Sequence, residues 1–272
     1  MQDIYSDIAR RTGGDIYIGV VGPVRTGKST LIKRFMESLV IPNIESDYKK
    51  ERAVDELPQS AAGKTIMTTE PKFIPEEAVP VQLGAGAQFR ARMIDCVGYI
   101  VPSALGYIEN EMPRMVMTPW FDEEIPFNMA AEIGTQKVIT EHATIGLVVT
   151  TDGSISDIPR EEYAEAEARV ISELQTLGKP FVVLLNCIDP HSDSARQLAS
   201  EMQEKYHTTV LPVSCVQLEE GDIREIMTAL LYAFPIREVG FAMPAWVSML
   251  DKGHPVKDAV FTCIREAAQG LK

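Results

Sequence analysis

The most constraining feature of the sequence is the segment Gly22-Pro-Val-Arg-Thr-Gly27-Lys28-Ser29, which fits the pattern G-x-x-x-x-G-K-[ST]. It directly follows an apolar β-branched run and opens a helical pattern, which is the context such a loop needs. Glycines let the backbone curl so that successive N–H groups point at phosphate oxygens, and the helix N-terminus adds partial positive charge. The segment therefore predicts a phosphate-binding loop for a nucleoside triphosphate and Mg²⁺.

Each position of this loop has an expected role. We expect Lys28 to reach the β- and γ-phosphates and the Ser29 hydroxyl to take a magnesium position. The other predicted nucleotide contacts in and beside the loop are Gly22, Val24, Arg25, Thr26, Gly27 and Thr30.

Short apolar runs alternate with longer helical patterns from Asp15 to about Phe234. The runs are Ile16–Gly22, Phe89–Asp95, Ala143–Thr150, Pro180–Asn186 and Thr208–Ser214. The helical patterns are Ser29–Leu39, Asn128–His142, Arg160–Leu177, Ser192–Tyr206 and Asp222–Phe234. Several runs are apolar without alternation, as in strands buried on both faces. We therefore predict an α/β fold of the P-loop class, with a mostly parallel sheet flanked by helices.

The pattern changes near Pro235, where we place a domain boundary. Residues 1–235 form the predicted nucleotide-binding domain, and residues 236–272 read as the start of a following, truncated region. In that region residues 235–239 suit an extended stretch and residues 256–268 suit a terminal helix.

Composition excludes several classes of protein. Hydrophobic residues are 45% and charged residues 24% of the chain, which excludes disordered, collagenous and disulfide-scaffold classes. The net charge of −13 disfavours nucleic acid and bare lipid as partners. The four cysteines are far apart and form no metal-binding pattern, which favours a reduced, cytosolic protein. We expect no transmembrane segment, because no apolar run approaches the roughly 18 residues needed.

A second nucleotide-binding signal is Asp95, which ends an apolar run and is followed by Cys-Val-Gly98, giving Asp-x-x-Gly. An acid at the carboxyl end of a strand can hold the water shell of Mg²⁺, and the Gly98 amide can sense the γ-phosphate. The pattern is weak alone, but its distance after the phosphate loop favours a Walker B motif. Tyr99 stands where a glutamine would often orient the attacking water. Hydrolysis is therefore expected to be slow, or completed by a residue from elsewhere.

A threonine-rich stretch, residues 63–71, lies between these two motifs. We expect Thr68 or Thr69, with Thr65 as the second choice, to close on Mg²⁺ and the γ-phosphate as a switch loop. The alternative is that these are β-prone residues entering an edge strand.

Two later strand ends suit a base pocket. Asn186-Cys-Ile-Asp189 and Ser214-Cys-Val stand where nucleotide switches of the GTPase superfamily carry Asn-Lys-x-Asp and Ser-Ala-Lys. The lysine that packs along base and ribose is missing, so guanine specificity is not predicted, although Asp189 can still accept hydrogen bonds from a base. The alternative is a turn with a helix N-cap, in which Asp189-Pro190 opens the following helix.

Residues 106–126 suggest a long irregular insertion, of a kind that is usually functional. Arg114, Trp120 and the acidic residues 122–124 make it a candidate for a conformationally responsive surface. The alternative is a loop packed over the sheet edge.

Taken together, the segments GPVRTGKST, TIMTTEPKFIP, IDCVGYIVPSALGYIENEMPRMV, ATIGLVVTTDGSI and LLNCIDP closely resemble the stage IV sporulation protein A family. The resemblance covers essentially all 272 residues. It implies an ATPase related to the translation-factor GTPases that binds ATP and Mg²⁺. It also implies catalytic roles for Lys28, Asp95, Thr68 and Thr69, and metal-binding roles for Ser29, Asp95 and Thr69.

The resemblance also implies a setting and partners. Members of the family hydrolyse ATP and polymerise irreversibly into the basement layer of the endospore coat, in the mother-cell cytoplasm at the outer surface of the forespore. The implied partners are further copies of the chain, a small amphipathic forespore-membrane protein and other coat proteins, through regions beyond Lys272. The chain resembles the ATPase portion, residues 1–235, and the start of the next region.

Three functions compete. The leading hypothesis is an ATP-hydrolysing structural protein whose nucleotide state alters a polymerising surface. A regulatory or ribosome-assembly GTPase is the alternative, and the charge of −13 without a basic cluster speaks against it. A small-molecule kinase is a third hypothesis, which needs an acceptor site near the γ-phosphate.

Overall fold

The computed structural model describes residues 15–44, 46–58, 71–83, 87–109, 111–234 and 240–269. The chain divides into two compact units, Met1–Ala233 and Phe234–Lys272. This division lies beside the boundary that the sequence pattern suggests near Pro235.

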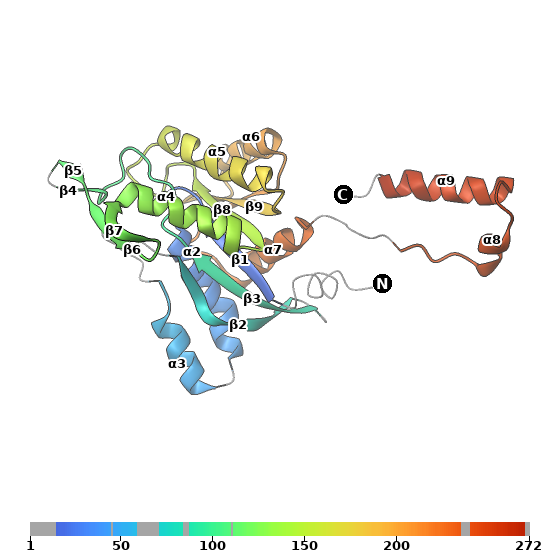
Figure 1. Cartoon of the computed structure of the whole chain (residues 1–272), viewed down its shortest axis with the longest axis horizontal. Coiled ribbons are helices and arrows are strands. Elements are labelled where there is room, and N and C mark those ends of the chain that lie inside the picture. Colours follow the sequence, from blue (N-terminus) through green and yellow to red (C-terminus); the bar gives the residue numbers. More distant parts are fainter. Residues whose placement is uncertain are drawn as a thin grey trace. The chain divides into compact units, whose positions relative to one another are not determined.

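A central sheet of six strands, in the order β10-β9-β8-β1-β3-β2, is the framework of the first unit (Figure 1). Its strands are β1 (Asp15–Val21), β2 (Lys72–Leu83), β3 (Ala87–Asp95), β8 (Ile145–Thr151), β9 (Phe181–Asn186) and β10 (Val210–Val213). All neighbouring pairs are parallel except β2 with β3, which is antiparallel. The predicted mostly parallel sheet is therefore confirmed, and the carboxyl ends of its parallel strands share one edge.

Helices flank the sheet, which explains why β8 and β9 have no exposed residue. The α-helices among the described residues of this unit are α2 (Lys28–Phe35), α3 (Asp47–Asp55), α4 (Phe127–Lys137), α5 (Arg160–Thr176), α6 (Asp193–Tyr206) and α7 (Glu220–Tyr232). Tyr163, Val170 and Leu174 of α5 are fully buried in the core. Gly146 allows α5 to approach closely, since a Cβ there would lie 2.9 Å from Leu174.

The ends of the helices differ from the sequence expectation in detail. The first two predicted helices each end in a π-helical turn, Met36–Val40 after α2 and Val138–His142 after α4. The alternative prediction for Asp189 was a turn with a helix N-cap. The turn is present, because Asp189 Oδ1 accepts from the His191 amide at 3.0 Å, but Asp189-Pro190 does not open the helix. Ser192 is the N-cap of α6, because its side chain accepts a hydrogen bond from the Ala195 amide.

The sequence analysis predicts an irregular insertion at residues 106–126, and this prediction is wrong. The segment contains two β-hairpins. β4 (Ile108–Glu109) pairs with β5 (Met112–Pro113), and β6 (Met115–Thr118) pairs with β7 (Phe121–Pro126). The second hairpin forms because Val116 and Ile125 pack on Phe127, Ala130 and Ala131 of α4, while Met115 and Met117 face outward. This alternation is the signal that the sequence analysis missed.

The second unit contains α8 (Ala245–Met249) and α9 (Pro255–Gln269), and α9 matches the predicted terminal helix. The Lys257 ammonium ties the two helices together by donating to the Ser248 and Leu250 carbonyls, at 3.0 and 2.7 Å. The stretch 235–239, expected to be extended, lies outside the described residues. Across the described part of the chain, no helix has the length and apolar character needed to cross a membrane.

Candidate functional site

The phosphate loop joins β1 to α2 in a conformation that requires its glycines. Gly22, Arg25 and Gly27 have φ angles of 138°, 62° and 96°. A Cβ at Gly22 would collide with the Val149 carbonyl, and one at Gly27 with the Asn186 side chain. The Thr26 hydroxyl donates to the Pro23 carbonyl at 3.0 Å, which closes the curl of the backbone.

Lys28 lies at the centre of this curl, with only 5% of its surface exposed. Its ammonium donates to the Pro23 carbonyl at 2.6 Å and to the Gly22 carbonyl at 3.4 Å. Burial lowers the pKa of Lys28, and neighbouring Cys96 and Asp95 oppose that shift. The loop thus presents a buried cation at the position where phosphate binding is predicted.

Ser29 and Asp95, the two predicted metal-binding residues that the structure describes, are in contact. The Ser29 hydroxyl donates to Asp95 Oδ2 at 2.9 Å, because β3, which ends at Asp95, pairs directly with β1. Among the described residues Asp95 Oδ1 is buried and has no hydrogen-bond partner. Burial also raises the pKa of Asp95, which the charge of Lys28 opposes.

This pair fits a magnesium site. An acidic side chain with a free oxygen beside a hydroxyl is a usual partial ligand set for Mg²⁺, which keeps several waters and takes phosphate oxygens for the rest. In the described part of the chain no group of three or more His, Cys, Asp or Glu residues is placed to bind a metal without such help. Thr65, Thr68 and Thr69 lie outside the described residues, so their predicted contacts stay predictions.

The Asp-x-x-Gly segment lies directly against the phosphate loop. The Val24 amide donates to the Tyr99 carbonyl at 2.9 Å, and the Tyr99 amide donates to the Gly22 carbonyl at 3.3 Å. Gly98 approaches so closely that an added Cβ would lie 2.7 Å from the Lys28 ammonium. The two motifs begin at Gly22 and Asp95, which are 73 residues apart in the sequence. The pairing of β1 with β3 brings them together.

The Tyr99 side chain points away from the phosphate loop and into the packing against α5. Its hydroxyl lies 2.7 Å from both Glu173 carboxylate oxygens, and the Arg169 guanidinium carbon lies 4.3 Å from its ring centre. Burial, followed by the bond to Glu173, raises the pKa of Tyr99. The side chain is thus held within the fold, and hydrolysis is still predicted to be slow, or to be completed by a residue from elsewhere.

Asn186, the last residue of β9, links the phosphate loop to the loop after β10. Its side-chain amide donates to the Thr26 carbonyl at 2.9 Å, while its oxygen accepts from the Cys215 amide at 3.0 Å. Both ends of this buried amide are therefore used within the protein. The sequence analysis expected a nucleotide contact and missed this tethering role.

Asp189 lies at the surface and lines a groove of about 660 Å³ between the loop after β9, strand β10 and helices α6 and α7. Its Oδ1 accepts from the His191 amide at 3.0 Å, which forms a local turn. The predicted contact of Asp189 with a base stays a prediction. The groove also presents His191, Arg196, Ser214, Glu219 and Asp222.

The loop after β8 contacts the loop after β9, where the base of the nucleotide is expected to bind. The Ser154 hydroxyl accepts from the Ile188 amide at 3.0 Å and donates to Asp152 at 2.6 Å. Burial raises the pKa of Cys187 to about 11, and the charges of Asp152 and Asp189 add to the shift. Two carboxylates are therefore near enough to the thiol that stands in place of the lysine to raise its pKa. The sequence analysis did not single out Asp152.

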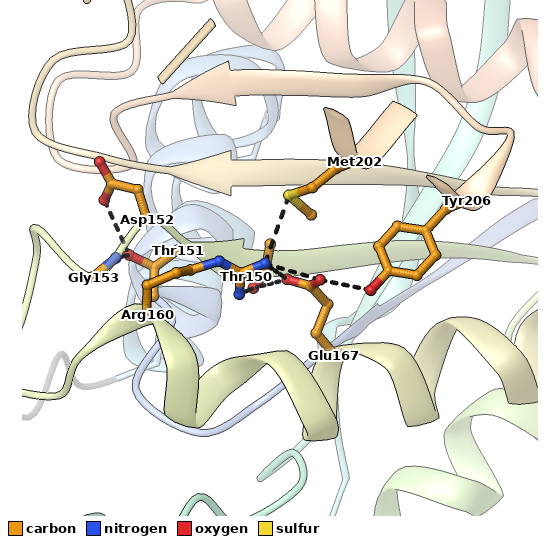
Figure 2. Close-up of polar contacts among 8 residues, drawn as sticks. All are labelled: Thr150, Thr151, Asp152, Gly153, Arg160, Glu167, Met202 and Tyr206. Carbon is orange, nitrogen blue, oxygen red and sulfur yellow. Dashed lines mark hydrogen bonds and ion pairs between the residues drawn. The ribbon is translucent and has the colours of Figure 1, made fainter. Parts of the chain in front are cut away.

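Behind this loop lies a buried ion pair (Figure 2). Fully buried Glu167 accepts from the Thr150 hydroxyl at 2.6 Å and from the Tyr206 hydroxyl at 2.9 Å, and it pairs with Arg160 at 2.7 Å. Arg160 is the first residue of α5, and Thr150 lies near the end of β8. The network therefore fixes both ends of the connection between β8 and α5.

A nucleotide-binding protein of the P-loop class is defined by these features together: the mostly parallel sheet, the glycine-rich curl between β1 and α2, and the side chains of Lys28, Ser29 and Asp95. The sequence pattern of the family described as "Stage IV sporulation protein A, ATPase domain" matches residues 1–235. The chain belongs to that family.

Curated relatives carry the name stage IV sporulation protein A. The relative from Clostridioides difficile (strain 630) is 53% identical over 265 residues, which is 97% of this chain and 54% of the relative. Those from Bacillus anthracis and Bacillus subtilis (strain 168) are each 51% identical over 270 residues, which is 99% of this chain and 55% of the relative. The chain thus spans about half the length of the curated relatives it matches.

Proposed function

We propose that this chain binds ATP with Mg²⁺ and hydrolyses it slowly, as the nucleotide-binding part of a protein that assembles the basement layer of the endospore coat. The observation that carries the proposal is the contact between Ser29 and Asp95 beside buried Lys28. The names of the family and of the relatives support the ATPase activity and the setting in sporulation.

We place the domain in the GTPase-like, translation-factor-related class. The order of the strands supports this, with the Asp95 strand between β1 and an antiparallel edge strand. The positions of Asn186 and Cys215, which join two strand ends to the phosphate loop, support it further. ATP is favoured over GTP because Cys187 replaces the lysine that supports a guanine base.

The chemistry assigned to the side chains is mainly positioning and charge stabilisation. Mg²⁺, held by Ser29 and Asp95 together with Thr69, would neutralise charge on the phosphates. Lys28 would hold the β- and γ-phosphates, and Thr68 with Thr69 would close over them. Because Tyr99 is turned away, slow turnover is expected.

The partners and location follow from the family resemblance. We propose that the protein polymerises with copies of itself on the mother-cell side of the forespore. Contacts with a small amphipathic membrane protein and with other coat proteins are assigned to regions beyond Lys272.

Parallel titrations with Mg-ATP and Mg-GTP, followed by measurement of phosphate release without an added acceptor, test this function. We expect tighter binding of ATP, release of phosphate, and loss of most nucleotide affinity in Lys28→Ala. Lys33→Ala, on the surface of the same helix, is the matched control. Equal or tighter GTP binding would overturn the ATP assignment. Formation of ADP and a phosphorylated acceptor, only when an acceptor is added and without release of inorganic phosphate, would favour a kinase.

A double variant, Thr68→Ala with Thr69→Ala, tests the switch threonines. We expect it to bind ATP as the unmodified chain does and to hydrolyse ATP more slowly. Turnover at the unmodified rate would show that these threonines are not the sensor.

A further inference from the structure

Thr135 of α4 is a buried hydroxyl that contacts the Asp-x-x-Gly segment and has no role in the function proposed above. It is 0% exposed, and its Oγ1 donates to the Ala131 carbonyl one helical turn earlier, at 2.8 Å. The same Oγ1 accepts a hydrogen bond from the Gly98 amide at 3.2 Å. The Ala131 carbonyl is the nearer acceptor for its one proton, since Cys96 Sγ lies 3.8 Å from Oγ1, and the hydroxyl offers Gly98 a lone pair.

Gly98 has a single backbone N–H group, so its bond to Thr135 competes with any other hydrogen bond that this group could donate. The same N–H is the donor expected to sense a γ-phosphate. Gly98 also lies where this phosphate must approach, since a Cβ on it would come within 2.7 Å of the Lys28 ammonium. Gly98 therefore cannot keep its bond to Thr135 and also donate to a phosphate held by Lys28.

The neighbouring residue reinforces this arrangement. Tyr99 exchanges two backbone hydrogen bonds with the phosphate loop, and one of them uses the Val24 amide. The Tyr99 side chain is held by Glu173 and Arg169 of α5. Arg169 also pairs with Glu132 of α4 at 2.8 Å, so α4, α5 and residues 98–99 form one connected set of contacts.

We propose that Thr135 is a positioning residue that holds the Gly98 amide away from the γ-phosphate, so that ATP, but not ADP, must break this bond to bind fully. The inference rests on the proposed function, because it assumes a nucleotide bound by Lys28. Thr135 thereby sets how strongly the site distinguishes ATP from ADP. A ligand shifts a conformational equilibrium only by its difference in affinity for the two states, and only the γ-phosphate supplies that difference here.

Binding measurements on Thr135 variants test the inference. Thr135→Val keeps the shape but lacks the acceptor, Thr135→Ala lacks it as well, and Thr135→Ser keeps it. Dissociation constants are measured with Mg²⁺ for ADP and for the non-hydrolysable analogue adenylyl imidodiphosphate. We expect Thr135→Val and Thr135→Ala to bind the analogue about 5-fold more tightly, a change typical of one hydrogen bond, with ADP affinity unchanged. Thr135→Ser should keep the original ratio of the two constants.

The two nucleotides separate positioning from a purely structural role. If both constants change by the same factor, or if the analogue binds more weakly in the variants that lack the hydroxyl, the inference is overturned. Urea unfolding checks that each variant is folded, and Thr135→Ala serves if valine disturbs α4. If the unmodified chain binds neither nucleotide, the proposed function fails instead.

Discussion

Buried and partly buried polar side chains hold the strand-end loops of the sheet together. Asn186 joins the loop after β9 to the phosphate loop, and Ser29 joins the phosphate loop to the end of β3. Glu167 contacts both ends of the connection between β8 and α5, through Thr150 and Arg160. Because a buried polar group is costly when it loses its partner, these residues fix loop positions that backbone pairing alone would leave variable.

The Glu167 network gives the sharpest stability prediction at this scale. Glu167→Ala removes the carboxylate that pairs with Arg160 and accepts from Tyr206. We therefore expect the free energy of unfolding to fall by about 3–5 kcal/mol. Glu165→Ala, on the exposed side of the same helix, should change it by less than about 0.5 kcal/mol. Urea denaturation measures both, and similar losses in the two variants would contradict a special role for the buried pair.

The cysteines give a prediction about reactivity. Burial raises the pKa of Cys96 to about 11 and that of Cys215 to about 12, so at pH 8 their thiolate fractions fall far below that of an ordinary thiol. Cys263, in contrast, is exposed. A thiol reagent at pH 8 should therefore modify one cysteine quickly in the folded chain and all four after unfolding. Cys263→Ser should remove the fast phase, and a fast phase that persists would show that another thiol is accessible.

Site residues that belong to one short motif could be predicted from the sequence. Residues whose role depends on loops meeting in the folded protein could not. Lys28, Ser29 and Gly98 belong to short motifs with a known chemical logic, and the structure brings them together with Asp95. The tether made by Asn186 requires the knowledge that the loops after β9 and β10 meet the phosphate loop, which no local pattern contains.

At the scale of elements, α4 is the piece that connects most of the unusual features. Its first residue, Phe127, is fully buried, donates its amide to the Arg114 carbonyl at 2.8 Å, and lies under the Arg114 guanidinium. Its inner face supports the hairpin of β6 and β7 and carries Thr135. The segment expected to respond to nucleotide is thus attached to the same helix that holds the Gly98 amide.

A pair of neighbouring residues tests how the hairpin is held. Val116 is 8% exposed and packs toward α4, whereas Met117 is 54% exposed on the opposite face. Val116→Ala should lower the free energy of unfolding by about 1–2 kcal/mol, because it removes buried methyl groups. Met117→Ala should have little effect. Equal effects in urea denaturation would mean that the hairpin does not pack on α4 in solution.

The long periodic helices were predicted to within a few residues because each buries one continuous stripe, as α5 does with Tyr163, Val170 and Leu174. The hairpins were missed because their strands are short, with β4 and β5 exposed and β6 and β7 only partly buried. In Met115–Thr118 only every second side chain is covered, and it is covered by a helix that comes later in the sequence. Tertiary packing, which the local pattern does not contain, makes this segment ordered.

At the scale of the whole molecule, the order of the sheet explains why one edge carries all the nucleotide chemistry. β1 lies between β3 and β8, so the phosphate loop is flanked by the Asp95 segment on one side and by the loops after β8, β9 and β10 on the other. Ligands of open parallel sheets bind at the carboxyl ends of the strands, close to such a reversal of strand order. All the described site residues belong to the first unit.

This arrangement predicts that the first unit carries the nucleotide response alone. A chain shortened after Phe234 keeps the complete sheet and every described site residue. At a concentration of about 100 times its Kd, Mg-ATP should stabilise both the shortened and the full chain by about 2.7 kcal/mol, because it binds only the folded state. Lys28→Ala should abolish this gain in both. Urea denaturation with and without Mg-ATP measures it, and stabilisation confined to the full chain would mean that residues 235–272 contribute to the site.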